Sequence, residues 1–168
     1  TIGGIEPGAR NVISGNAEDG ITIQGGRLNS VQGNFIGTTA DGLHALGNLL
    51  AGVSIEDSVG NTVGGTLAAR NVISGNGTGG YVTGAGSGKN SVLANYIGTD
   101  KDGVNEVGNL DGVVISGATG NRVGGPLRGE RNVISGNGRF GVVVTYSSGN
   151  AVQGNYIGTD WSGREWVG

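Results

Sequence analysis

The heptapeptide "RNVISGN" occurs three times in the chain, at residues 10–16, 70–76 and 131–137. A second phrase recurs with the same spacing, as "GNFIGT" at 33–38, "ANYIGT" at 94–99 and "GNYIGT" at 154–159. Self-similarity at a fixed period is the signature of a repeat architecture. The chain therefore divides into repeats of about sixty residues, at roughly 1–60, 61–120 and 121–168.

Each complete sixty-residue repeat contains two shorter units. A phrase of the form Gly-[Val/Ile]-x-[Val/Ile], or a looser version of it, opens the units at residues 20–23, 52–55, 80–83, 112–115 and 141–144. Every opener is followed by Asn-x-Val, and then by Asn-x-Ile. The unit is thus a coil of roughly thirty residues with three short strands, and the chain holds between five and six coils.

The composition is typical of a folded repeat protein rather than of a disordered chain. Of the 168 residues 39 are glycine, yet 35% are hydrophobic, so there is apolar surface to bury. The formal net charge of -3 supplies no basic face for nucleic acid. There is no long apolar run for a membrane span and no cysteine for a disulfide. Because methionine is absent, we expect the chain to be part of a longer protein.

The repeat length excludes local hairpins, because equivalent segments lie about thirty residues apart. Pairing each strand with its copy in the next coil places neighbouring coils about 4.8 Å apart, in parallel register. The predicted fold is an all-β solenoid that forms one domain over residues 1–168. Alternate side chains face outward, and in the first strand of each coil the outward residues are Thr22, Ser54, Val82, Val114 and Val143.

The asparagines that open the second and third strands form two predicted columns. Asparagine tolerates the left-handed conformation that a corner needs, and stacking lets each amide bond the next. The first asparagine column contains Asn29, Asn61, Asn90, Asn121 and Asn150. The second contains Asn11, Asn34, Asn71, Asn95, Asn132 and Asn155. We expect both columns to be structural, because they satisfy polar groups at buried corners.

These spacings resemble a known class of repeat. The pattern Gly-[Val/Ile]-x-[Val/Ile], followed by Asn-x-Val-x-Gly-Asn-x-Ile, resembles the right-handed parallel β-helix repeats of the pectin-lyase-like superfamily. "NVISGN" and "GNYIGTD" look like tandem repeats of large bacterial surface or secreted proteins. The resemblance covers the whole chain and implies a right-handed single-stranded parallel β-helix. It does not define an activity, because this fold hosts lyases, hydrolases, epimerases, adhesins and phage tailspikes.

No catalytic residue is predicted from the sequence. Glycoside hydrolysis needs two carboxylates about 5–10 Å apart, so such a pair should occupy matching outward positions of adjacent coils, or positions i and i+2 along one strand. The outward positions of the second strand are small or neutral apart from Arg122, and nearly all carboxylates fall in loops or corners. The single histidine, His44, also falls in a loop. We therefore expect a protein that is not an enzyme, with a segment of a polysaccharide lyase or hydrolase as the alternative.

A row of arginines could contact a partner. Arg10, Arg70 and Arg131 hold one place in each sixty-residue repeat, about 10 Å apart if two coils separate them. They could grip an anionic polysaccharide. Alternatively, each could staple its preceding loop by bonding carbonyls or a loop carboxylate.

An apolar stripe could also contact a partner. The residue after the asparagine of the third strand alternates between valine and an aromatic ring, at Phe35, Tyr96 and Tyr156. If this residue faces outward, its rings could stack on sugars. Alternatively, the loops cover the stripe with their large apolar side chains, which are Leu43, Leu46, Leu67, Val104, Val107, Leu127, Trp161 and Trp166.

One loop contains a candidate calcium site, and calcium is the only cofactor considered from the sequence. "TDKDG" at 99–103 offers Asp100 and Asp102 as oxygen ligands, and Asp160 is the equivalent of Asp100 in the last repeat. The other copies break the pattern, because Thr39 replaces Asp100 and Ser162 replaces Asp102. A turn role for these carboxylates is the competing interpretation.

The expected function is that of a structural repeat region in a bacterial extracellular or cell-surface protein, acting as a stalk, adhesin or filament. A carbohydrate-binding module that uses the stripe and the arginine row is the alternative. A solenoid needs caps, because exposed strand edges invite pairing. We therefore expect either a longer array in the parent protein or self-association end to end.

Overall fold

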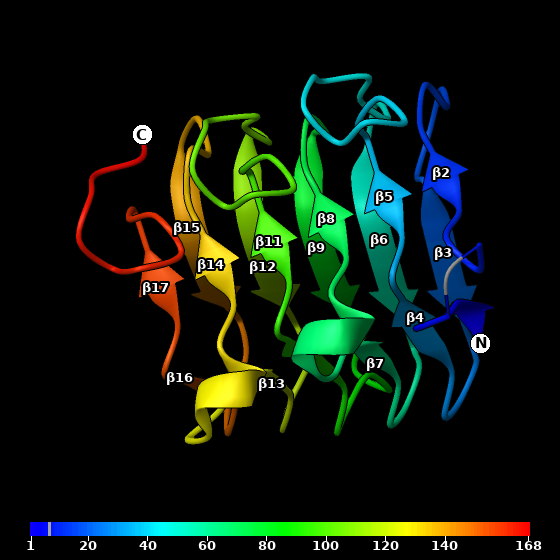
Figure 1. Cartoon of the computed structure of the whole chain (residues 1–168). Helices are drawn as coiled ribbons and strands as arrows, with labels where there is room; N and C mark the ends of the chain where they lie inside the picture. The colour runs from blue at the N-terminus through cyan, green and yellow to red at the C-terminus, as the bar shows by residue number, and fades with distance from the viewer. Residues whose placement is uncertain (7) are drawn as a thin grey trace.

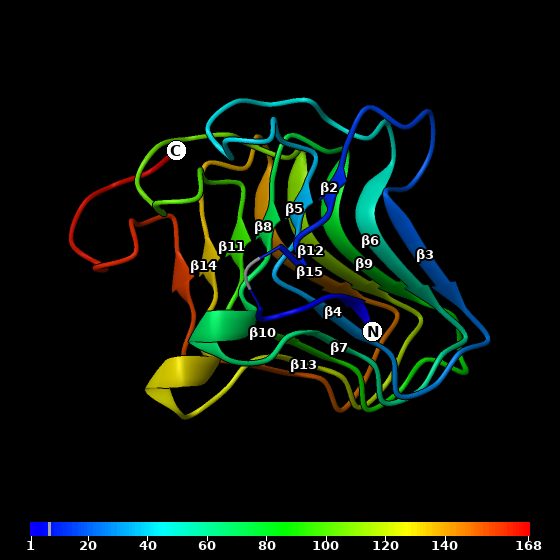
Figure 2. The same ribbon diagram turned by 45° about the vertical axis from the view of Figure 1, so that its right-hand side comes forward.

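The computed structural model describes residues 1–6 and 8–168, which form a parallel β-solenoid of about five turns, as the sequence predicts. Each complete turn contributes one strand to each of three sheets, and each strand pairs in parallel with its counterpart in the next turn. Figure 1 shows the turns side by side, with the two ends of the chain at opposite ends of the stack. Figure 2 shows the three sheets around one shared interior.

The first sheet runs in the order β3-β6-β9-β12-β15. Its strands are β3 (Ile21–Gln24), β6 (Ala51–Glu56), β9 (Thr78–Thr83), β12 (Asp111–Ser116) and β15 (Phe140–Thr145). Side chains alternate along each strand, so that Ile21 and Ile23 are buried while Thr22 is exposed. The aliphatic residues of this sheet therefore stack in columns inside the solenoid.

One predicted orientation in this sheet is wrong. Val82 was predicted to face outward, but it is only 2% exposed, and its neighbour Tyr81 faces out in register with Ser54. The coil opens at Gly79 rather than at the following glycine, and a slip of one residue turns every side chain of a strand to the other face. Glycine is required at this corner, because a Cβ on Gly79 would lie 2.6 Å from the side chain of Ile97.

The second sheet runs in the order β1-β4-β7-β10-β13-β16. Its strands are β1 (Ile2–Gly3), β4 (Ser30–Gln32), β7 (Thr62–Gly64), β10 (Ser91–Leu93), β13 (Arg122–Gly124) and β16 (Ala151–Gln153). The valine of each inner strand points into the interior, and Val31, Val63 and Val123 are fully buried. This column of valines meets the isoleucines of the first sheet in one core.

The third sheet runs in the order β17-β14-β11-β8-β5-β2. Its strands are β2 (Val12–Ile13), β5 (Phe35–Ile36), β8 (Val72–Ile73), β11 (Tyr96–Ile97), β14 (Val133–Ile134) and β17 (Tyr156–Ile157). The isoleucine of each strand joins the core, and Ile36, Ile73 and Ile97 are fully buried. Since neighbours on a strand point to opposite faces, the valine or aromatic residue before each isoleucine faces outward.

Both predicted asparagine columns are hydrogen-bonded ladders. Asn71 donates its main-chain N–H and one Nδ2 proton to Asn95 Oδ1, at 3.2 and 2.9 Å, and its other Nδ2 proton to the Val31 carbonyl at 2.9 Å. Asn34 in turn donates its N–H and Nδ2 to Asn71 Oδ1, at 2.9 and 3.1 Å. The side chain of Asn71 thus makes four hydrogen bonds. Equivalent amide-to-amide hydrogen bonds join the asparagines of the first column.

A third asparagine column was not predicted. It lies at the corner between the third and first sheets and contains Asn16, Asn48, Asn76, Asn109 and Asn137. The Nδ2 groups of Asn16, Asn48, Asn76 and Asn109 each donate to the Oδ1 one coil further on, at 2.7 to 3.0 Å. With this column, one asparagine ladder runs along each of the three corners of the solenoid.

Two kinds of loop border the third sheet at opposite ends of its strands (Figure 1). The short 3-10 turns η1 (Leu67–Ala69) and η2 (Arg128–Glu130) precede β8 and β14. The loops at 39–47, 100–108 and 160–168 follow the strands. These loops stack as the coils do, because Lys101 N–H donates to the Gly42 carbonyl and Trp161 N–H to the Gly103 carbonyl, both at 3.0 Å.

Candidate functional site: an arginine groove on the third sheet

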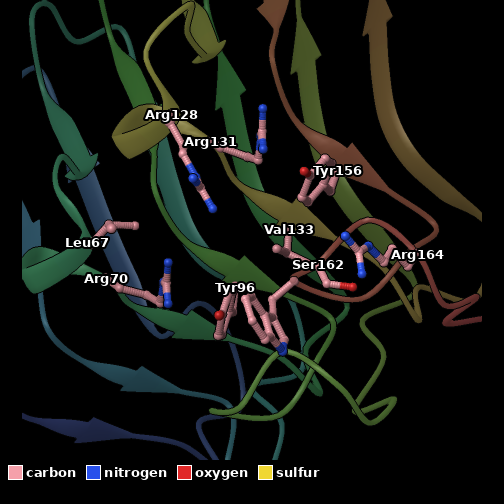
Figure 3. A pocket seen from close by; sticks show the side chains of 10 residues that line it. Leu67, Arg70, Tyr96, Arg128, Arg131, Val133, Tyr156, Ser162 and Arg164 are labelled. Carbon is pink, nitrogen blue, oxygen red and sulfur yellow. The ribbon is translucent and has the colours of Figure 1, made fainter.

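A groove of about 500 Å³ lies over the outward face of the third sheet, between the two kinds of loop. We call it the arginine groove, because Arg70, Arg128, Arg131 and Arg164 all line it. Tyr96, Tyr156 and Trp161 supply its aromatic surface. Figure 3 shows the labelled arginines around a common opening: Arg70 and Arg131 directly follow the 3-10 turns η1 and η2, Arg128 lies in η2, and Arg164 lies in the last loop.

The repeated arginines make the same two contacts in each repeat. Arg70 Nε donates to the Ala94 carbonyl at 3.0 Å, and its guanidinium lies 3.9 Å from the centroid of the Tyr96 ring. Arg10 and Arg131 lie over their own aromatic rings at 4.1 and 4.0 Å. The carbonyl and the ring both belong to the next coil. Each arginine therefore ties two coils together, instead of stapling the loop that precedes it.

The alternating stripe is covered along most of its length. Its buried members are Phe35, Val72, Tyr96 and Val133, and they form an apolar cluster outside the main core. Tyr156 packs against this cluster and is half-buried. The loop lies directly on the ring of Tyr96, since a Cβ on Gly103 would come within 2.7 Å of it. The last loop lies on the ring of Tyr156 in the same way, through Gly163, so both tyrosines are covered and Tyr156 is the more accessible of the two.

The cover does not come from the large apolar side chains of the loops. Of these, Val107 is buried, and the exposed ones are Leu43, Leu46, Leu67, Val104, Leu127, Trp161 and Trp166. The cover consists instead of an arginine side chain over each ring and of loop glycine main chain in contact with it. A glycine at φ +70°, such as Gly103, lets the loop approach the ring this closely.

The four guanidinium groups of the groove have no anionic partner among the residues described. The three ion pairs found there join Lys101 to Asp102, Arg122 to Glu130 and Arg139 to Asp111. Burial lowers the pKa of Arg70, an effect that Tyr96 opposes, but an arginine stays protonated at neutral pH. Burial also raises the pKa of the Tyr96 hydroxyl, despite the opposing charge of Arg70. The groove therefore gathers four guanidinium groups, and the carboxylates of Asp102, Asp100 and Asp160 lie near enough to raise the pKa of Tyr96 as well.

The calcium candidates serve as turn acceptors. Asp100 Oδ1 accepts the N–H groups of Asp102 and Val104, at 3.1 and 3.0 Å, and Asp160 makes the equivalent bonds in its own loop. Burial raises the pKa of both Asp100 and Asp160, but the hydrogen bonds outweigh it and the net shift is downward. Asp102 pairs with Lys101 at the surface. Within residues 1–6 and 8–168, no three His, Cys, Asp or Glu side chains gather as a metal site would require.

A second groove, of about 610 Å³, lies on the outward face of the first sheet and is lined by Tyr81. Its carboxylates take part in structural contacts. Asp111 forms an ion pair with Arg139, and Asp19 accepts the N–H of Ala51 at 2.8 Å. This groove contains charges of both signs, including the Asp111–Arg139 ion pair, whereas the charged residues that line the arginine groove are four arginines, so the arginine groove is the stronger candidate for binding an anion.

Sequence reasoning found part of this site. Arg70, Arg131, Tyr96 and Tyr156 were singled out because they recur with the repeat. Arg128 and Arg164 were missed, since each lies in a loop whose copies carry no arginine at that place. The signal that could have found them is the alternation of the two loop kinds, which brings loops of neighbouring coils to the same sheet face.

Three parallel sheets, three asparagine ladders and the arginine groove define the chain as a parallel β-solenoid with one candidate binding surface. None of the protein-family models, curated proteins and solved structures compared with the chain matches it. No helix in the described part of the chain has the length and apolar character needed to cross a membrane.

Proposed function

We propose that the chain is a structural repeat segment of a bacterial extracellular or cell-surface protein, acting as a stalk, adhesin or filament, and that it is not an enzyme. The observation that carries this proposal is the continuity of the three asparagine columns along the solenoid. The resemblance of the repeats to right-handed β-helices of the pectin-lyase-like superfamily supports it as well. The proposed mechanism is geometric, because each coil adds length to a rod.

The contacts between coils favour this role. Each coil is joined to the next by strand pairing at three sheets and by side-chain amides at three corners. With a rise of about 4.8 Å per coil, five coils extend a rod by about 24 Å. In a solenoid each coil is stabilised by its contacts with the neighbouring coils. If the hydrogen bonds at one corner break, the ladders at the other two corners still hold the two coils together. A segment of this kind holds its ends at a fixed distance.

The cellular part of the proposal is tested by antibody labelling of the organism that produces the protein. Antibodies against the chain should label intact cells or the culture medium. Labelling that appears only after lysis would contradict an extracellular role. The structural part is tested by limited proteolysis of the chain in solution. Cleavage should be confined to the exposed loops, whereas rapid cleavage within the strands would contradict a rigid rod.

We further propose that the last turn is covered either by further coils of a longer chain or, where the chain is a separate molecule, by end-to-end association. In the last turn Val144 is 44% exposed and Ile157 is 47% exposed, while Ile115 and Ile134, their counterparts one turn earlier, are at most 1% exposed. Stacking a second copy on this end would continue the aliphatic columns and their strand pairing.

Light scattering after size-exclusion chromatography tests the stacking. The chain should form oligomers whose mass falls on dilution. Ile157→Lys should reduce the association, while Leu67→Lys, an exposed position in the middle of the solenoid that serves as the control, should not. A monomer at every concentration would contradict end-to-end association, and so would equal effects of the two substitutions.

A further inference from the structure

The arginine groove concentrates positive charge on a protein whose formal net charge is -3. Arg128 and Arg164 reach toward the opening from opposite sides (Figure 3). Both are exposed, and neither forms an ion pair with another described residue. An exposed guanidinium can give two parallel hydrogen bonds to a carboxylate or sulfate group. These two side chains are therefore free to engage an anionic ligand.

Arg70 and Arg131 fix the spacing of charge along the groove. Each holds its Nε on a main-chain carbonyl of the next coil, at 3.0 and 2.7 Å. Each guanidinium is also held against an aromatic ring, so little side-chain entropy remains to be lost on binding. The two arginines lie just before β8 and β14, two strands of the third sheet that are two coils apart, which corresponds to about 10 Å. A ligand with anionic groups at regular intervals fits this arrangement.

The aromatic surface narrows the class of ligand. Trp161 is 54% exposed, and Tyr156 is half-buried beside Arg131. Amphipathic rings of this kind provide flat apolar surface next to polar groups, which suits a sugar ring that carries C–H groups on one face. A groove with charged donors and exposed aromatic faces differs from a plain basic patch, because it can bind the neutral part of the ligand as well.

We propose that the arginine groove binds an acidic polysaccharide, whose carboxylate or sulfate groups bond Arg128, Arg164 and the repeated arginines while a sugar ring packs on Trp161. This site is independent of the structural role of the solenoid. The net charge of -3 repels any polyanion over most of the protein surface, so the proposal depends on the groove itself, where the guanidinium groups and the exposed Trp161 lie together. Ligand chemistry that combines sugar rings with spaced anions is the best match.

Isothermal titration calorimetry with the full 168-residue chain tests this assignment. The ligands are polygalacturonate as the carboxylated polymer, dextran sulfate as the sulfated polymer, and dextran as the uncharged control. We expect binding to at least one acidic polymer, weakened by added salt, and none to dextran. Polyglutamate and single-stranded DNA serve as anionic polymers of other classes, and both should bind at least about tenfold more weakly.

Matched variants locate the binding on the protein. Arg128→Gln/Arg164→Gln removes two charges from the groove, and Arg27→Gln/Lys89→Gln removes two charges from exposed corners outside it. Hydrogen bonds to charged groups are strong enough that the groove variant should lose about tenfold to a hundredfold in affinity. The corner variant should bind as the unmodified chain does, and circular dichroism should show both variants folded.

Stacking is tested by two tryptophan substitutions. Trp161→Ala should weaken binding of the acidic polysaccharide, while Trp166→Ala, which changes an exposed ring that does not line the groove, should not. The assignment is overturned if no acidic polymer binds, if dextran binds equally well, or if the groove and corner variants lose the same affinity. Binding of polyglutamate or DNA as tight as that of the polysaccharides would overturn the sugar specificity.

Discussion

Replacing Asn71 by alanine deletes four side-chain hydrogen bonds from the middle of the second asparagine column. Two are donated by Asn71 Nδ2, to Asn95 Oδ1 and to the Val31 carbonyl. The other two are accepted by Asn71 Oδ1, from the N–H and the Nδ2 of Asn34. Both asparagines of this pair are 0% exposed, so water does not reach the groups that lose their partner.

The cost follows from the donors that are left unsatisfied. Without Asn71 Oδ1, the main-chain N–H of Asn34 and one of its Nδ2 protons have no acceptor. An unsatisfied buried donor costs about 1–3 kcal/mol, so Asn71→Ala should lower the free energy of unfolding by about 2–6 kcal/mol. Asn11 is the matched control, since it is exposed and its side chain donates only one bond, to Asn34 Oδ1 at 2.9 Å. Asn11→Ala should cost about 1 kcal/mol or less.

Thermal and urea unfolding followed by far-ultraviolet circular dichroism compare the two variants. Because a domain of this size loses about 2–4 °C of melting temperature per kcal/mol, Asn71→Ala should melt roughly 5–15 °C below Asn11→Ala. Urea titration should give the same order of stability. Equal melting temperatures for the two variants would refute the claim that buried amide ladders hold the corners together.

Three further substitutions test other parts of the structure. The pKa of Asp100 is lowered in the folded chain, so its contribution to stability is present at neutral pH and is lost as the pH falls through that pKa. Asp100→Asn should therefore be less stable than the unmodified chain at pH 7, and melting curves should converge in acid; a gap independent of pH would contradict this. Gly103→Ala should cost about 1–3 kcal/mol more than Gly117→Ala in urea unfolding. Both have positive φ, but only at Gly103 does a Cβ approach the Tyr96 ring, so equal costs would argue against the packed loop. Lys89 has φ +57° at an exposed corner, and Lys89→Gly should stabilise the chain by up to about 1 kcal/mol in the same assay, whereas a loss of stability would count against strain there.

The fold was predictable because the repeat fixes which residues lie one coil apart. Asn71 and Asn95 could be aligned from their neighbours alone, and the structure bonds them directly. Tyr81 could not be oriented in the same way, because two consecutive glycines precede it and either could open the coil. Local packing of Gly79 decides between them, and packing between coils is not visible in a single coil's sequence.

Loops explain the other differences between prediction and structure. The third asparagine column was missed, because a long loop separates Asn48 and Asn109 from the strands before them, whereas Asn16, Asn76 and Asn137 follow their strands closely. The arginine groove was only half predicted, since Arg128 and Arg164 have no copies in the other repeats and meet only in space. The repeat pattern in the sequence predicts only those parts of the solenoid that recur in every coil. Binding residues on its loops require the three-dimensional arrangement.

The central claim is that equivalent segments lie over one another along one axis. In the first sheet Gln24, Glu56, Thr83, Ser116 and Thr145 occupy one register position in five successive coils. The backbones of Gln24 and Thr145 should then lie about 19 Å apart, four coil spacings. The chain has no cysteine, so Gln24→Cys/Thr145→Cys can be spin-labelled at these two sites alone. Pulsed electron paramagnetic resonance should give one narrow distribution of the distance between the two labels, centred at about 19 Å. A broad distribution, or one centred far from that distance, would contradict axial stacking.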